Sequence, residues 1–313
     1  MQRTLFTPSI LHRVVRRQFS QSRAQNALSP FTRRLFQLPA APSPPSLHHT
    51  DLASFLAYAE RTALPTTSTT YIGTEYEYSV LQSLRRFAFT LHRVGGRDDA
   101  GIDLVGTWHI PRLEPRTPIR VIVQCKAFKT KLGPNLVREL EGAFRGSPLG
   151  WRTRETVGVL VSPREATKGV RDAMARSTYP LLWMMMAQDG TLRQALWNRH
   201  VEELGLGGLG VEARYTADDS SEAAHPETKR LALTWDGDDL PHMDQVEAVM
   251  ARREAEWVSR WQEDDAGMPE ASKHRLLDIL EDAYPDLTHI DGISPGKVER
   301  SKILEQMRSN GLE

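Results

Sequence analysis

The feature that most constrains the fold is the segment Ile119–Lys126, in which β-branched residues dominate. Because such residues pack well on a pleated surface, the segment predicts a buried strand. Apolar periodicity predicts further strands at 87–94, 102–108, 157–162 and 181–186, and helices at 73–86, 134–144 and 164–176. This order of elements indicates an α/β fold with a central mixed sheet flanked by helices.

Weaker patterns lie outside this core. A helix is expected at 51–61, and further patterns predict a helix at 191–204 and a strand at 231–235. Three helical stretches follow Asp236, and the first carries apolar residues at spacings of three, four and seven: Met243, Val246, Met250, Trp257 and Trp261. The sequence therefore predicts one domain over residues 51–235, with its core at 71–186, and an acidic helical C-terminal region over 236–313.

The formal net charge of zero, from 40 basic and 40 acidic residues, conceals three unlike segments. Residues 1–50 contain seven Arg and no acid, and residues 51–235 contain 24 basic and 21 acidic residues, a net charge of +3. Residues 236–313 contain 9 basic and 19 acidic residues, a net charge of −10. The single cysteine, Cys125, excludes an internal disulfide and a zinc site built from several cysteines. No stretch approaches the roughly 18 apolar residues of a membrane-spanning helix, so no membrane span is expected.

The first segment is typical of a mitochondrial targeting peptide. Arginines border the apolar side of the helix that residues 3–17 would form, and Asp and Glu are absent. The sequence after Arg17 resembles a matrix-processing site with cleavage after Phe19, so we expect a targeting peptide at 1–19 and a location in the matrix. Residues 20–50 are expected to form a Pro-rich disordered linker. The alternative for residues 1–50 is a disordered basic tail that binds nucleic acid.

Polar side chains lie at the ends of two neighbouring predicted strands. Gln124 and Lys126 are two residues apart, so their side chains leave the same face of one strand, and Asp103 begins the strand before it. If these strands pair, a carboxylate, an amide oxygen and an ammonium converge, and Glu77 on a neighbouring helix adds a second carboxylate. Mg²⁺, or Mn²⁺ in its place, prefers oxygen ligands, here Asp103, the Gln124 oxygen and the Cys125 backbone carbonyl. With Lys126 stabilising negative charge, the set suits metal-dependent phosphodiester cleavage.

Simpler interpretations exist for each of these residues. Asp103, Gln124 and Lys126 could form an ordinary polar edge of a sheet. Cys125 alternates to the opposite face and is expected to be an inert core residue. Asp99 is expected to brace the glycine-rich turn before Asp103 rather than to bind metal.

Four motifs around these residues carry a family resemblance: Gly73-x-x-Tyr76-Glu77, Gly95-Gly96-x-x-Asp99-x-Gly101-Ile102-Asp103, Gln124-Cys125-Lys126 and Arg138-Glu139-Leu140-x-Gly142. Residues 71–186 thereby resemble the Mrr-type branch of the PD-(D/E)xK nuclease superfamily. The resemblance implies a restriction-endonuclease-like fold, an active site at Asp103, Gln124 and Lys126, and a helix carboxylate at Glu77. Gln124 stands where the superfamily has Asp or Glu. This change removes one negative charge and should weaken metal binding.

A second resemblance is carried by the segments Tyr71–Tyr78, Gly106–Trp108 and Trp197–Asn198. They are similar to the fungal mitochondrial "required for respiratory growth" proteins. This resemblance implies a role in maintaining the mitochondrial genome, which agrees with the targeting peptide predicted at 1–19.

Charge around the predicted site indicates the kind of substrate. Residues 112–176 hold 14 basic and 6 acidic residues, a net charge of +8, which fits contact with a DNA backbone through residues such as Lys129, Lys131, Arg138 and Lys168. The alternative is a solvated basic face. Three hypotheses follow: a mitochondrial DNA nuclease, a DNA-binding maintenance factor without turnover, and a scaffold whose acidic C-terminal helices bind a protein partner.

Overall fold

The computed structural model describes residues 28–96, 101–111, 118–128, 130–216, 228–261, 267–284 and 297–309. The predicted targeting peptide at 1–19, Asp99 and Lys129 lie outside these ranges. Among the described helices, none combines the length and apolar character that crossing a membrane requires.

A six-stranded mixed sheet forms the centre of the molecule, and its strands follow one another in sequence order. They are β1 Phe89–Arg93, β2 Leu104–Trp108, β3 Ile119–Cys125, β4 Val157–Ser162, β5 Leu181–Met186 and β6 Leu192–Trp197. β1, β2 and β3 pair antiparallel, β3, β4 and β5 pair parallel, and β6 returns antiparallel to β5. The predicted α/β fold with a central mixed sheet is confirmed, and β3 lies inside the sheet as its β-branched residues indicated.

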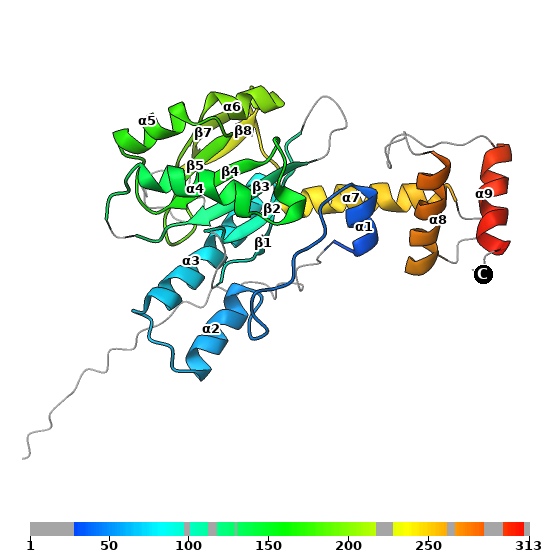
Figure 1. Ribbon diagram of the computed structural model, residues 1–313, viewed down its shortest axis with the longest axis horizontal. Coiled ribbons are helices and arrows are strands. Elements are labelled where there is room, and N and C mark those ends of the chain that lie inside the picture. Colours follow the sequence, from blue (N-terminus) through cyan, green and yellow to red (C-terminus); the bar gives the residue numbers. More distant parts are fainter. Residues whose placement is uncertain are drawn as a thin grey trace, which may run out of the picture.

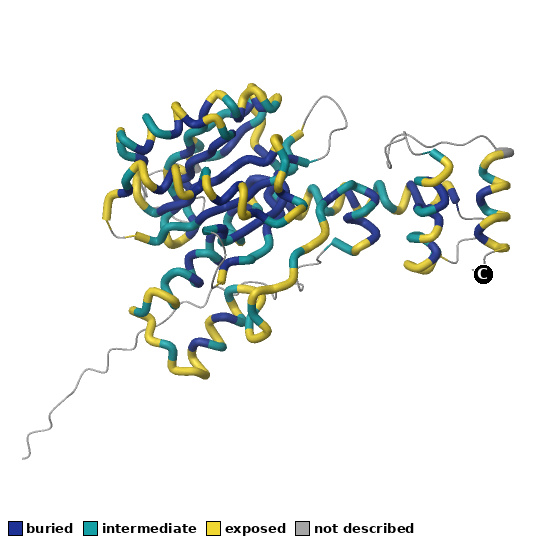
Figure 2. Tube along the Cα trace, in the orientation of Figure 1, coloured by how far each residue is buried: buried dark blue, intermediate teal, exposed yellow. Residues whose placement is uncertain are grey.

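Helices cover both faces of this sheet (Figure 1). On one face α3, Thr69–Leu84, packs its buried residues against the side of β3 that carries Val121 and Val123. On the other face α4, Asn135–Gly146, and α5, Lys168–Arg176, pack against the side that carries Ile122. The strands between these layers are the most deeply buried part of the chain (Figure 2).

Short elements precede and connect these layers. They are α2 Leu52–Arg61, η1 Arg85–Phe87 and η2 Leu149–Trp151. α2 begins one residue after the predicted start because Asp51 caps it, accepting a hydrogen bond from the Ser54 N–H at 2.8 Å. α3 begins four residues earlier than predicted, since Ser68 Oγ accepts from the Tyr71 N–H at 3.2 Å and caps the helix there.

The segment 191–204 differs from the prediction of a helix. Its first half is the edge strand β6, followed by the single turn α6, Arg199–Val201, and the turn η3, Glu202–Leu206. The apolar spacing of this segment suits either structure. The exposed edge of β5 decides between them, because pairing there satisfies backbone hydrogen bonds and buries Leu192 and Ala195 in the core beside α3.

A second sheet of three strands packs on the same side as α3. Its strands are β7 Leu209–Thr216, β8 Thr228–Trp235 and β9 Asp238–Asp239. Only β8 matches a strand predicted from the sequence, at 231–235. β7 pairs with β8 along its whole length, and Leu209 and Leu233 join the core.

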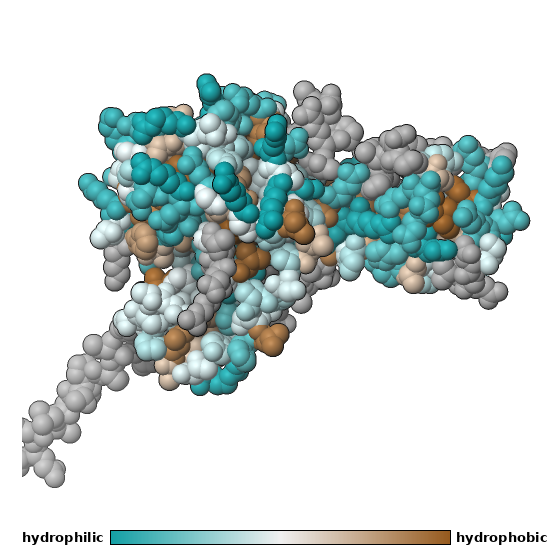
Figure 3. Space-filling view, viewed as in Figure 1, coloured by the Kyte–Doolittle hydropathy of each residue, from teal (hydrophilic) through white to brown (hydrophobic). Residues whose placement is uncertain are grey.

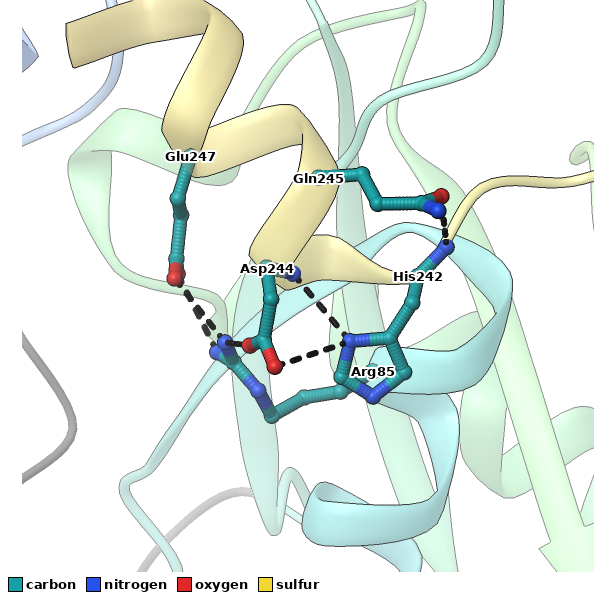
Figure 4. A network of polar contacts seen from close by, with 5 residues as sticks. All are labelled: Arg85, His242, Asp244, Gln245 and Glu247. Carbon is teal, nitrogen blue, oxygen red and sulfur yellow. Dashed lines mark hydrogen bonds and ion pairs between the residues drawn. The ribbon is translucent and has the colours of Figure 1, made fainter. Parts of the chain in front are cut away.

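The described residues of the C-terminal region form three helices, as the sequence predicted: α7 Met243–Ser259, α8 Glu270–Ala283 and α9 Lys297–Ser309. α7 extends from the domain and meets α8 near its far end (Figure 1). Polar contacts hold its first turns to the domain (Figure 4), since the Arg85 guanidinium binds the carboxylates of Glu247 at 2.9 Å and Asp244 at 2.6 Å. His242 and Gln245 cap the start of the helix.

Residues 20–50 were expected to be a disordered linker, and here the described part differs. Pro30–Leu35 forms the short helix α1, in which Phe31 and Leu35 are fully buried among α7, α8 and α9. Thr32 Oγ1 donates to Glu254 at 2.6 Å, and the Arg33 guanidinium lies 3.2 Å from His92 Nε2 on β1. The N-terminal segment therefore joins the C-terminal helices to the domain, which no local pattern in a Pro-rich stretch could indicate.

Candidate functional site

The two strands that carry the site pair antiparallel, which is the condition that the predicted site required. Leu104 of β2 lies opposite Val123 of β3, and the Asp103 N–H donates to the Val123 carbonyl at 3.0 Å. The same register, continued by one residue, places Asp103 opposite Gln124. Ile122, two residues before Gln124, packs in the core beside α4, so Gln124 leaves β3 on the α4 side.

Asp103 is held from two directions. Its Oδ2 accepts the Cys125 N–H at 2.6 Å, and its backbone carbonyl accepts the N–H groups of Val94 and Gly95 at 2.8 and 2.9 Å. A Cβ on Gly95 would lie 3.2 Å from the Asp103 Cα and 3.3 Å from its Oδ1. The glycine motif therefore acts by letting the backbone close on the carboxylate.

Gln124 is buried, with 2% of its surface exposed, and its side-chain Oε1 has no hydrogen-bond partner in the described part of the chain. Gly101, at a φ of +78°, leaves room for the same amide: a Cβ there would lie 3.0 Å from Gln124 Nε2. A buried carbonyl oxygen without a donor costs roughly 1–3 kcal/mol. This oxygen is therefore available to a ligand that accepts electron pairs, such as a cation.

Lys126 extends from the end of β3 toward α4. Its Nζ lies 3.2 Å from Glu139 Oε2 and 6.0 Å from the centre of the Phe128 ring. Sequence reasoning assigned no role to Glu139 or Phe128, although Glu139 belongs to the helix motif that carried the resemblance. The Lys126–Glu139 contact agrees with the prediction that Gln124 and Lys126 share a face.

Glu77 lies on α3, which covers the other face of the sheet. Its Oε2 accepts from Arg93 Nε at 2.5 Å, and both side chains are mostly buried. Burial raises the pKa of the Cys125 thiol, and the charges of Asp103 and then Glu77 raise it further. The thiol therefore stays protonated, as expected of an inert cysteine.

The oxygen atoms at the site could bind a hard cation only weakly. The described residues contain no group of three or more His, Cys, Asp or Glu placed to bind a metal ion. The oxygen donors at the site are instead one carboxylate, Asp103, and neutral oxygens such as Gln124 Oε1. A hard cation accepts such ligands, but a single negative charge predicts weak binding.

The described residues that were predicted to bind nucleic acid lie on the side of the sheet that α4 and α5 cover. Lys131, Arg138 and Lys168 are exposed, before α4, on α4 and at the start of α5, and Lys168 pairs with Asp172 at 2.8 Å. Hydrophilic side chains gather over α4 and α5 (Figure 3). The structure therefore places these three cations on the helix layer that Gln124 and Lys126 face.

Comparison with known proteins identifies relatives of this chain. The family described as Required for respiratory growth protein 7 matches residues 68–117 and 113–215. An uncharacterized mitochondrial protein of Schizosaccharomyces pombe is 33% identical over 156 residues, which cover 49% of this chain and 61% of that protein. Required for respiratory growth protein 7, mitochondrial, of Saccharomyces cerevisiae is 30% identical over 168 residues, covering 41% and 69%. Its counterpart in Vanderwaltozyma polyspora is 29% identical over 200 residues, covering 46% and 79%.

The chain thus spans less than two thirds of the Schizosaccharomyces pombe relative and somewhat more of the two others. The matched family segment includes α3, the six-stranded sheet and β7. It therefore contains all the residues of the candidate site. No solved structure matches the chain.

Proposed function

The chain belongs to the family of mitochondrial proteins named required for respiratory growth protein 7, and from this premise we propose that it is a metal-dependent nuclease acting on mitochondrial DNA in the matrix. Its domain would be of the restriction-endonuclease-like type, and its cleavage would support maintenance of the mitochondrial genome. The observation that carries the proposal is the buried Gln124 oxygen, which lacks a hydrogen-bond donor in the described residues and lies in register with Asp103.

The residues present fit a hard divalent cation. Asp103, Gln124 Oε1 and the Cys125 backbone carbonyl would hold Mg²⁺ or Mn²⁺. When bound, such an ion supplies a Lewis acid and acidifies a coordinated water. Two features prepare the site for it: the Cys125 N–H fixes the Asp103 carboxylate at 2.6 Å, and the absence of a Cβ at Gly101 leaves room for the Gln124 amide.

Lys126 would neutralise charge on the phosphate during cleavage. Its ion pair with Glu139 at 3.2 Å keeps the ammonium beside the end of β3 while leaving other donor hydrogens for a phosphate oxygen. Glu77 has a different role in this proposal. Because its carboxylate binds Arg93, we assign it to holding α3 to β1 rather than to the metal.

DNA is the proposed substrate because of the cations on the same side of the sheet. Lys131, Arg138 and Lys168 are exposed and would contact phosphates without reading base identity. Binding through such contacts releases the counterions condensed on DNA, so the affinity falls steeply as the salt concentration rises.

The proposal is tested by incubating purified protein with single-stranded, duplex and branched DNA in Mg²⁺ or Mn²⁺. Cleavage should appear and should stop when the metal is chelated. Asp103→Ala and Lys126→Ala should each lower the rate by about 10²-fold or more, and Asp103→Ala should leave DNA affinity nearly unchanged. Glu60→Ala, at an exposed position of α2, is the matched carboxylate control and should cleave like the wild type.

A second function is favoured by two observations: the Lys126 ammonium already has a carboxylate partner, and the donor set holds a single carboxylate. These features suit a DNA-binding maintenance factor without turnover. Absence of metal-dependent cleavage on all three DNA forms, with salt-sensitive binding retained by Asp103→Ala, would support that function and reject the nuclease. Absence of DNA binding at low salt would reject both and leave the protein-binding role of the acidic helices.

A further inference from the structure

An exposed aromatic side chain lies beside the candidate site. Within the described residues two aromatic side chains are strongly exposed, Phe128 at 48% and Tyr215 at 60%. Tyr215 lies on β7 of the second sheet, whereas Phe128 follows the end of β3 by three residues. Single exposed apolar side chains are ordinary. Phe128 is unusual because its ring contacts a charged residue of the site.

The contact is with Lys126, whose Nζ lies 6.0 Å from the centre of the Phe128 ring. The same Nζ lies 3.2 Å from Glu139 Oε2, so the ammonium is bounded by a carboxylate and an aromatic ring. A phosphate that approaches Lys126 therefore arrives next to the ring. The sugar or base attached to that phosphate is the part of a nucleic acid that can reach the ring.

We propose that Phe128 stacks on an unpaired base next to the phosphate bound at Lys126, so that the site prefers single-stranded or frayed DNA over continuous duplex. The inference deepens the proposed function, since it assumes that nucleic acid binds at this site. Every base has an aromatic face, and stacking on a protein ring contributes about 1–3 kcal/mol per base. A base inside a duplex has both faces covered by its neighbours, so only an unstacked base offers a free face to Phe128.

The test is a comparison of binding, made with the full chain and with the metal chelated so that no cleavage occurs. A fluorescent single-stranded oligonucleotide and the same sequence as a blunt duplex are titrated at low salt. Phe128→Ala should weaken single-strand binding roughly 5- to 150-fold, which corresponds to the loss of one stacked base. Its duplex affinity should stay within about twofold, because phosphate contacts dominate there.

Three further variants separate stacking from other causes. Phe128→Trp should bind the single strand at least as tightly as the wild type, whereas Phe128→Leu, which keeps apolar volume without an aromatic face, should behave like Phe128→Ala. Tyr215→Ala removes the other exposed ring, on the second sheet, and should leave both affinities unchanged. Circular dichroism of each variant confirms that the fold is retained.

Several outcomes would overturn the inference. One is equal loss of affinity for single strand and duplex in Phe128→Ala, and another is wild-type behaviour of Phe128→Leu. A third is a wild-type dimer in light scattering that Phe128→Ala abolishes, because the ring would then be covered by a second copy of the chain. If Phe128 fails these tests while metal-dependent cleavage persists, only this inference falls. If stacking is observed without any cleavage, only the nuclease proposal falls.

Discussion

Replacing Gln124 by methionine tests whether this position is arranged for a cation. Methionine has nearly the same length and volume, so packing against neighbours should change by less than about 1.5 kcal/mol. The change removes the buried Oε1, which has no donor in the described part of the chain and costs roughly 1–3 kcal/mol. Without metal, Gln124→Met should therefore unfold at a higher temperature, by about 2–4 °C for each kcal/mol gained.

Added metal should reverse this order of unfolding temperatures, so that the wild type becomes more stable than Gln124→Met. If Gln124 is a ligand, Mg²⁺ at about 100 times its dissociation constant stabilises the wild type by about 2.7 kcal/mol. Gln124→Met should gain far less. Gln124→Glu should be the least stable variant without metal, because it buries a second carboxylate, and should gain the most when Mg²⁺ is added.

The assay is thermal unfolding followed by circular dichroism, with and without Mg²⁺. Gln194→Met is the matched control, since Gln194 Oε1 accepts the Ala166 N–H at 3.4 Å. That substitution removes a hydrogen bond that is made, so it should lower stability by about 0.5–1.5 kcal/mol in either condition. The reasoning is refuted if Gln124→Met is destabilised like Gln194→Met, or if Mg²⁺ protects Gln124→Met as much as the wild type.

Three other perturbations have defined outcomes. Phe31→Ala empties a fully buried site among the C-terminal helices and should destabilise them by about 3–5 kcal/mol, seen as a shift of tryptophan emission at lower denaturant; an unchanged midpoint would contradict the packing of α1. Gly101→Ala forces a side chain into a φ of +78° and should cost about 1–2 kcal/mol and weaken cleavage, whereas Gly142→Ala, with open space around an exposed helix position, should stabilise by about 0.5–1 kcal/mol. Burial, and then the charge of the nearby arginine, lowers the pKa of His92 and of His109 to about 4, so the unfolded chain binds more protons between pH 6.5 and 4. Stability should therefore be complete above pH 6.5 and fall by on the order of 3 kcal/mol per histidine as pH drops to 4, and a His109→Gln variant with an unchanged slope of unfolding free energy against pH would refute this.

Local patterns were sufficient to predict an element wherever its buried positions recur regularly along the sequence. β3 was predicted because its β-branched residues lie inside the sheet, and α4 because its apolar positions recur at helical spacing against one face. Alternation along β3 also predicted correctly that Lys126 and Gln124 share a face, because side chains on a strand alternate whatever the neighbours are. The pairing of Asp103 with the β3 end remained a condition at the level of sequence, and the structure meets it.

Tertiary structure decided what depends on residues distant in sequence. The segment after Thr191 became a strand because β5 offered an unpaired edge, and α1 folded because Trp257 and its neighbours buried Phe31. Thr32 reaches Glu254, 222 residues away, a contact that carries no signal in either local sequence. The same holds at the site: the sequence named Glu77 and Gln124, but only packing turned Glu77 toward Arg93 and left the Gln124 oxygen without a donor in the described residues. Periodicity and propensity act over a few residues, whereas the partner of a buried polar atom depends on which surfaces the whole chain brings together.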